Sequence, residues 1–268
     1  MMVSLLGIAG CASWVSNNGA KQVGSVVDYL YPNAKEVPQM KEEVTLLRPP
    51  VRIGIAFVPG GNWGAGLSET EKLKLLERVK AAFSKQPFIG AIEIIPSAYL
   101  QPKGGFTNME QVARMFNVEV VALLSYDQVQ FNDTNSLAVL YWTIVGAYII
   151  HGDQYDIQTL VDASIFDVRT HKLLFRAPGT SQIKGSASMS GFSERARVAR
   201  TEGYNKAVDE LIPQLQNELD KFKERIKSDA GIRVENKPGY SGGGSLDWLG
   251  FALACALTVI GYAKRRLT

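Results

Sequence analysis

The chain of 268 residues is 46% hydrophobic, so about 190 to 200 residues remain for one domain with a sizeable core when both ends are set aside. Its net charge of +3 includes a basic cluster at the C-terminus, which leaves the central part close to neutral and argues against nucleic acid as a partner. The two cysteines, Cys11 and Cys255, lie near opposite ends of the chain, so no disulfide can stabilise the central part.

The N-terminus, MMVSLLGIAGCAS, leads through apolar and small residues to Cys11. The run Ile8-Ala9-Gly10-Cys11 resembles the bacterial lipobox, whose cysteine receives a diacylglycerol thioether and becomes the new N-terminus. This resemblance implies that residues 1–11 are a signal and that Cys11 is acylated. The usual Leu is replaced by Ile8, and the basic residues of a secretory signal are missing, which a start codon assigned too far downstream would explain. The alternative is an ordinary buried cysteine on an apolar strand.

Residues 12–50 contain scattered apolar residues and several prolines, which predicts a tether with one short helix near 21–30. Beyond residue 50, β-branched and alternating runs predict strands at 51–58, 91–95, 119–126, 136–150, 156–168 and 172–183. Apolar residues at helical spacing predict helices at 69–86, 108–116 and 193–226.

Three local features refine these helices and strands. Ser68 and Glu71 have the spacing of a capping box, and Thr107 is expected to cap the second helix. Pro213 should bend or split the last helix. The core face of that helix is expected to hold Val208, Leu211, Leu215, Leu219, Phe222 and Ile226.

The order of elements predicts a single α/β sandwich domain at 51–227, with a mixed sheet and helices mainly on one face. This order resembles the small α/β domain of periplasmic lipoproteins of the curli-secretion type and the N-terminal domain of the Tol-system translocation protein. The resemblance implies a fold and no function.

Few residues of this domain suggest chemistry. Residues 60–66 are glycine-rich between a strand and a helix, but their spacing fits no phosphate-binding motif, so a turn is favoured. His151, Asp153 and Asp156 could hold a metal, yet such residues in a polar loop are usually solvated. His171 falls in a hairpin turn. We therefore expect no catalytic residue, no metal and no cofactor.

The C-terminus has three parts, a linker at 228–245, an apolar stretch and a basic end. Leu246–Tyr262 is about 17 residues, or about 25 Å as a helix, at the short end for crossing a hydrocarbon core of about 30 Å. The cluster Lys264, Arg265 and Arg266 should stay in the cytoplasm, which places the domain on the other side of the membrane. Residues 246–268 are thus expected to hold a transmembrane helix; the alternative is a C-terminal helix buried in a soluble core.

Residues Gly242, Gly243, Gly244 and Ser245, followed by the apolar span and the basic end, resemble the GlyGly-CTERM sorting tail. Rhombosortases, intramembrane proteases of the rhomboid type, recognise such tails, which implies cleavage within 242–245. With the lipobox, the whole chain resembles the rhombotarget (rhombotail) lipoproteins. The resemblance implies an inner-membrane precursor with a periplasmic body, and Ala12 after the cysteine is compatible with delivery of the mature form to the outer membrane or cell surface.

Two functions of different classes follow. The first is a non-enzymatic cell-envelope lipoprotein whose body binds an envelope partner, either protein or glycan. The second is an envelope hydrolase with an unrecognised active site, permanently anchored by its C-terminal helix. The first is favoured because the titratable residues form no constellation that acid–base or covalent catalysis requires.

Overall fold

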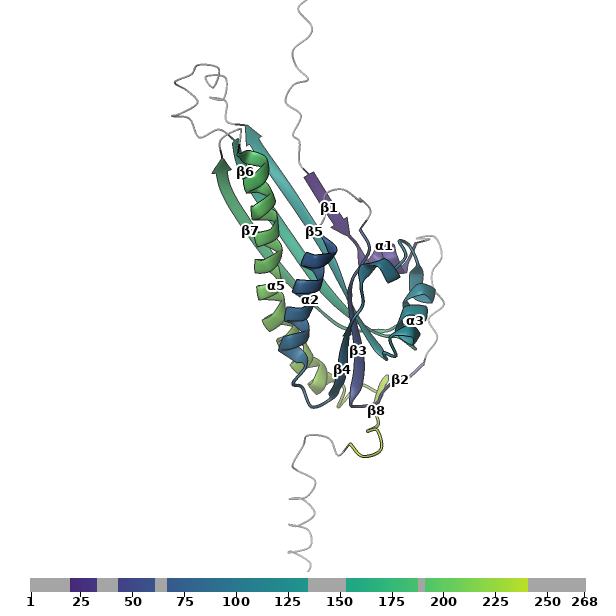
Figure 1. Ribbon diagram of the computed structural model, residues 1–268. Coiled ribbons are helices and arrows are strands. Elements are labelled where there is room, and N and C mark those ends of the chain that lie inside the picture. Colours follow the sequence, from purple (N-terminus) through teal and green to yellow (C-terminus); the bar gives the residue numbers. More distant parts are fainter. Residues whose placement is uncertain (1–19, 33–42, 61–66, 135–152, 188–190, 241–268) are drawn as a thin grey trace, which may run out of the picture.

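The computed structural model describes residues 20–32, 43–60, 67–134, 153–187 and 191–240 as one mixed α/β fold (Figure 1). Its elements follow the chain as β1 (Ala20–Gly24), α1 (Val26–Leu30), β2 (Thr45–Leu47), β3 (Val51–Phe57), α2 (Glu69–Phe83), β4 (Ile89–Ile94), a 3-10 turn (Ser97–Tyr99), α3 (Gly105–Met115), β5 (Val120–Thr134), β6 (Asp153–Asp167), β7 (Leu173–Ala187), α5 (Phe192–Arg225) and β8 (Ile232–Val234).

β5 is the central strand of a sheet with the order β4-β3-β5-β6-β7. β3 pairs in parallel with β4 and β5, whereas β5, β6 and β7 are antiparallel, so the predicted mixed sheet is confirmed. One side of β5 has two partners in succession: Val120–Leu124 pairs with β3, and Tyr126–Gln130 pairs with β1. β2 and β8 form a separate parallel pair.

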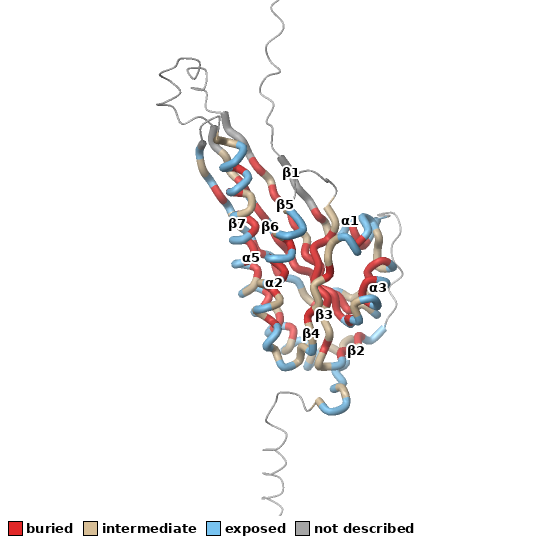
Figure 2. Tube along the Cα trace, viewed as in Figure 1, coloured by how far each residue is buried: buried red, intermediate tan, exposed pale blue. Residues whose placement is uncertain are grey.

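Side chains alternate along β5 and divide the core into two layers. Ala122 and Leu124 belong to the cluster under α2 and α5, whereas Val121 and Leu123 belong to the cluster under α1 and α3. Figure 2 shows the buried strand residues lying between these helices. The two long helices therefore share one face of the sheet, and the two short helices cover part of the other.

The sequence located most of these elements. Five of the six predicted strands correspond to β3, β4, β5, β6 and β7, although the last three run to 15 residues each. The sixth prediction, at 136–150, lies outside the described residues. The predicted helices correspond to α2, α3 and α5, and the capping box is present, with Ser68 Oγ accepting from Glu71 N at 3.2 Å.

One prediction about the helices was wrong, and of the two outcomes expected at Pro213, a bend or a split, the split does not occur. Thr107 lies inside α3, whose N-cap is Gly104, because the helix begins three residues earlier than its polar cap suggested. Pro213 does not divide α5, which runs unbroken from Phe192 to Arg225. Pro213 is exposed, so the carbonyl group that it leaves without a partner can bond to water, while the buried Leu211 and Leu215 hold the helix to the sheet on either side.

The predicted tether and linker also contain folded elements. Residues 20–24 form a strand, so the helix expected near 21–30 is reduced to α1 at 26–30. β2 and β8 lie within 12–50 and 228–245, where no strand was expected. Short elements of three to five residues escape periodicity analysis because they contain at most one turn or one alternation.

In the part of the chain that the structure describes, no helix is both long and apolar enough to cross a membrane. The predicted transmembrane segment at 246–268 lies outside that part.

Candidate functional site

A groove of about 550 Å³ lies between α1 and the sheet face that α2 and α5 leave uncovered. The end of β1 and helix α1 form one wall, and residues of β5, β6 and β7 form the floor. Ligand sites are typically concave and combine apolar walls with a few polar groups, which makes this groove a candidate binding surface.

The groove has an apolar rim made of exposed side chains. Val27 is 65% exposed, Leu173 48%, Tyr31 39% and Leu160 38%, and all four line the groove. Single exposed apolar residues need no explanation, but a group around one concavity is typical of an interaction site.

The floor contains an ion pair that is buried on one side. Asp162 is 8% exposed, and its Oδ1 accepts from Arg176 Nε at 3.0 Å and from Arg176 Nη2 at 2.8 Å. Ser164 Oγ donates to the other oxygen, Oδ2, at 3.2 Å. The Arg176 side chain is 60% exposed and extends into the groove region as a charge that a ligand can reach.

Helix α1 holds its wall of the groove through a buried anchor. Tyr29 is 2% exposed, and its hydroxyl group donates to Asn108 Oδ1 in α3 at 3.0 Å. Burial raises the pKa of Tyr29, so this hydroxyl keeps its proton throughout the physiological range. At the end of the helix, Tyr31 packs edge-on against Phe106, with ring centroids 5.3 Å apart.

The predicted hairpin turn places His171 beside α3. Its ring stacks on Phe106 with centroids 4.3 Å apart, and its Nε2 lies 2.7 Å from Glu110 Oε1. His171 also has a φ of 60°, a left-handed conformation that is uncommon outside glycine. These contacts explain His171 as a residue that attaches the β6–β7 turn to α3.

A second polar cluster lies at the carboxyl ends of β3 and β4. Lys72, which is 9% exposed, donates to Glu69 Oε1 at 2.8 Å and to Ser97 Oγ at 3.3 Å, and Ser97 Oγ donates to Glu69. Burial disfavours the charged carboxylate, but these hydrogen bonds and the charge of Lys72 outweigh it and lower the pKa of Glu69. The cluster is therefore a stable ion pair that joins α2 to the 3-10 turn, which a nucleophile–base pair would not be.

The residues that the sequence singled out lie elsewhere. Cys11, Gly242, Gly243, Gly244, Ser245, Lys264, Arg265 and Arg266 are all outside the described residues, as are His151 and residues 61–66. Asp156 accepts from Gln182 Nε2 at 2.8 Å and lies 3.6 Å from Lys184 Nζ. Within the described ranges, no group of three or more His, Cys, Asp or Glu residues could hold a metal ion.

The sequence analysis missed the groove, although the hairpin contained a clue. The turn after β6 sets a register in which Ser164 pairs with Arg176 and Asp162 with Pro178, which places the carboxylate and the guanidinium on the same face. The apolar rim gave no comparable clue because Val27 lies in α1 and Tyr31 is its C-cap, both in the segment expected to be a tether.

Comparisons with known proteins give no family. No family model and no curated protein matches this chain. Among solved structures, a homologue of the neuraminyllactose-binding hemagglutinin from Helicobacter pylori aligns with a TM-score of 0.38 and 9% identity over 73% of this chain and 96% of that one. A PelC dodecamer from Paraburkholderia phytofirmans gives 0.28 and 13% over 73% and 96%, and lipoprotein B from Nitrosomonas europaea gives 0.32 and 11% over 71% and 97%. Similarity this low supports no assignment of family or function.

Proposed function

We propose that the chain is an exported, non-enzymatic lipoprotein of the bacterial cell envelope, acylated at Cys11 and processed at its C-terminus by a rhombosortase-type protease. The observation that supports this proposal is the presence of both terminal motifs in their correct places, the lipobox at Ile8–Cys11 and the Gly242–Ser245 tail before an apolar span and a basic end. Each motif is moderately specific alone, and their combination is more so.

Membrane energetics favour removal of the tail. Acyl chains contribute about 0.8 kcal/mol per buried methylene, so a multiply acylated Cys11 already anchors the protein firmly. A second anchor at Leu246–Tyr262 adds little to retention, and it would prevent transfer to the outer membrane because the basic cluster would have to leave the inner bilayer. Cleavage within 242–245 would remove the second anchor and leave the acylated Cys11 to hold the mature protein at the membrane.

Mass spectrometry of the mature protein from native membranes tests this proposal at both termini. We expect an acylated Cys11 and the loss of about 25 C-terminal residues, and replacing Gly242 and Gly243 with bulky residues should leave a full-length form in the inner membrane. A Cys11→Ser variant should lose labelling by a palmitate analogue. Mature protein that retains Lys264–Thr268, or a Cys11→Ser variant that still takes the label, would contradict the respective half of the proposal.

The folded domain would then bind an envelope protein through the groove beside α1. The rim offers apolar contacts, and the floor carries the ion pair of Asp162 and Arg176, whose guanidinium side is the more exposed. A polypeptide segment that places an acidic side chain beside an apolar one suits this surface, because the exposed charge in the groove is the guanidinium group of Arg176.

Site-specific photo-crosslinking in cells checks the groove. A photoreactive residue at Leu160, inside the groove, should give a discrete adduct, whereas one at Val198, which is 53% exposed on α5, should not. An Arg176→Ala change should weaken the Leu160 adduct because it removes a groove charge. Identical adduct patterns at both positions would count against the groove.

A further inference from the structure

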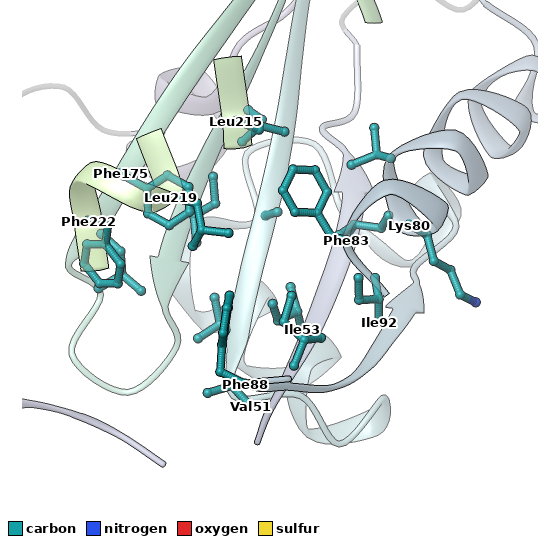
Figure 3. Close-up of a pocket in the computed structure, with 18 of the residues that line it drawn as sticks. Val51, Ile53, Lys80, Phe83, Phe88, Ile92, Phe175, Leu215, Leu219 and Phe222 are labelled. Carbon is teal, nitrogen blue, oxygen red and sulfur yellow. The ribbon is translucent and has the colours of Figure 1, made fainter. Parts of the chain in front are cut away.

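An apolar cavity of about 130 Å³ lies on the other face of the sheet, between α2 and the C-terminal part of α5 (Figure 3). Val79 and Phe83 of α2 line one side, and Leu215, Leu219 and Phe222 of α5 line the other. The floor consists of aliphatic side chains of β3 to β6, among them the small residues Ala122 and Ala163.

The lining of this cavity contains one charged residue, Lys80, in the last turn of α2. Figure 3 shows that the side-chain nitrogen of Lys80 points away from the cavity, so the methylene stem contributes to the wall and the charge lies at the edge. No hydrogen bond or ion pair joins this ammonium group to any residue that the structure describes. It is therefore available to an anion.

The cavity continues into a groove of about 390 Å³ at the lower end of the fold. The two spaces share five lining residues, Leu47, Val51, Phe88, Leu219 and Phe222. The groove adds apolar side chains such as Pro49, Ile226 and Tyr240, and also Lys223, which is paired with Asp220, so its walls remain largely apolar. A linear molecule can thus extend from the cavity into the groove, while a bulky one cannot enter the cavity.

The apolar lining of the cavity decides what can occupy it. A cavity of about 150 Å³ with an apolar lining stays dry and takes up molecules such as benzene, because water finds no hydrogen-bond partners there. Each methylene group that moves from water into such a site raises affinity about fourfold. The requirements are thus a thin, flexible, apolar body and, at one end, a negative charge for Lys80.

We propose that this cavity and groove bind a single unbranched acyl chain, that of a fatty acid whose carboxylate pairs with Lys80. The methylene chain runs between α2 and α5 and ends in the groove near Phe222. The proposal does not depend on the acylation of Cys11 or on the fate of the tail, because all its residues belong to the described domain.

Photo-labelling of the full chain in lipid vesicles tests this proposal. The probe is palmitate with a diazirine in the middle of its chain, and labelled residues are located by mass spectrometry. We expect labelling of α2 and α5 near Val79 and Leu219, with competition by unlabelled palmitate. Ala163→Leu should fill the cavity and reduce this labelling about tenfold.

A pair of lysine variants separates the head group from the chain. Lys80→Glu should reduce labelling about fivefold, the size expected for one exposed charge pair, while Lys74→Glu, exposed on the same helix, should leave it unchanged. Labelling confined to the apolar stretch at 246–262, or unaffected by Ala163→Leu in a folded protein, would overturn the proposal. If Ala163→Leu does not fold, equal labelling of the Lys80→Glu and Lys74→Glu variants would likewise overturn the proposal.

Discussion

The two halves of α5 pack against the same sheet in opposite ways. The N-terminal half, Phe192–Ala207, presents the small residues Ala199, Gly203 and Ala207 at every fourth position, all of them buried. The C-terminal half, Val208–Arg225, presents large side chains, including Leu211, Leu215 and Phe222. Close approach holds the first half, whereas large apolar surfaces hold the second and leave the cavity beside α2.

Beneath the N-terminal half, hydrogen bonds add to the apolar contacts of Tyr204 and Ala199. Gln128 Nε2 donates to Thr159 Oγ1 at 2.7 Å and to the carbonyl oxygen of Arg200 at 3.0 Å. Ser181 Oγ donates to the carbonyl oxygen of Gly203 at 2.7 Å. These bonds need the helix backbone within reach of the strands, which the small residues allow. Hydrogen bonds are directional, so this polar layer fixes the position of the helix relative to the sheet. Apolar contacts are not directional, so the C-terminal half can lie farther from the sheet and leave space for a ligand.

The largest expected effect comes from Gly179→Ala. An added Cβ would overlap the carbonyl oxygen of Ala207 and lie 2.6 Å from Leu211 N, and backbone atoms of a helix cannot rotate away. We expect a loss of about 3 kcal/mol in the free energy of unfolding, at the upper end for overpacking. Urea denaturation of a fragment spanning residues 20–240, which retains every described strand, measures it.

Gly185→Ala is the matched control on the same strand. Its Cβ would meet the end of the Tyr155 side chain, which can move, so a loss under about 1 kcal/mol is expected. Equal losses at both positions would show that the strand, and not the approach of α5, makes glycine necessary.

Replacing alanine with valine should change the free energy of unfolding in opposite directions at a position in the closely packed region and at one that lines the cavity. Ala207→Val adds two methyl groups where Ala207 is fully buried against Gly179, and should cost about 2 kcal/mol. Ala163→Val adds the same groups into the cavity and should stabilise the fold by about 0.5 to 1 kcal/mol. Thermal unfolding of both variants compares them directly. A destabilising Ala163→Val would mean that the C-terminal half is as tightly packed as the N-terminal half.

The polar layer itself should contribute little net stability. The Oε1 atom of Gln128 is buried and has no hydrogen-bond partner among the described residues, which opposes the gain from the two bonds of its amide nitrogen. Gln128→Met should therefore change the free energy of unfolding by less than about 1 kcal/mol. Gln128→Ala, which leaves a void, should cost about 2 kcal/mol. A large loss in the Met variant would mean that the hydrogen bonds dominate.

The sequence predicted the C-terminal half of α5 better than the N-terminal half. Six residues were expected on the core face. Five of them are buried, namely Val208, Leu211, Leu215, Leu219 and Phe222, whereas Ile226 is the C-cap and is partly buried. Ala199 and Gly203 have the same spacing, but small residues carry almost no hydrophobic signal, and their role depends on Gly179 and Gln128, which are distant in the chain. Local periodicity identifies a large apolar face, whereas close packing becomes visible only when two segments are placed together.

The same limit applies to the two candidate sites. Leu160, Asp162 and Arg176 form part of the groove because β1 and α1 stand beside them, and the sequence assigned that segment to a tether. The cavity arises from residues on eight strands and helices, and nearly all of these residues are ordinary for a core. A space that several helices and strands leave unfilled cannot be predicted from the residues of any one segment.

The smallest expected effect concerns the link between α2 and the N-terminal half of α5. Glu71 Oε2 accepts from Ser68 N at 3.0 Å, and its Oε1 accepts from Thr201 Oγ1 at 3.2 Å. Burial opposes the charged form, but the bonds from Ser68 and Thr201 and the charge of Arg197 outweigh it and lower the pKa of Glu71. A lowered pKa adds stability at pH values above the ordinary value of 4.5, and this stability is lost as the pH falls through the folded-state pKa.

Glu71→Gln should therefore reduce the loss of stability between pH 5 and pH 3 by about 0.5 kcal/mol, a small amount because Glu71 is only partly buried and solvent screens it. Urea unfolding at several pH values measures this difference. Glu218→Gln is the control, since Glu218 pairs with Lys221 on the C-terminal half at 2.7 Å and does not contact α2 through any described hydrogen bond. If the control flattens the profile as much as Glu71→Gln, the acid sensitivity belongs to the general charge of the domain. If only Glu71→Gln flattens the profile, this part of the acid sensitivity arises where the capping box of α2 meets the N-terminal half of α5.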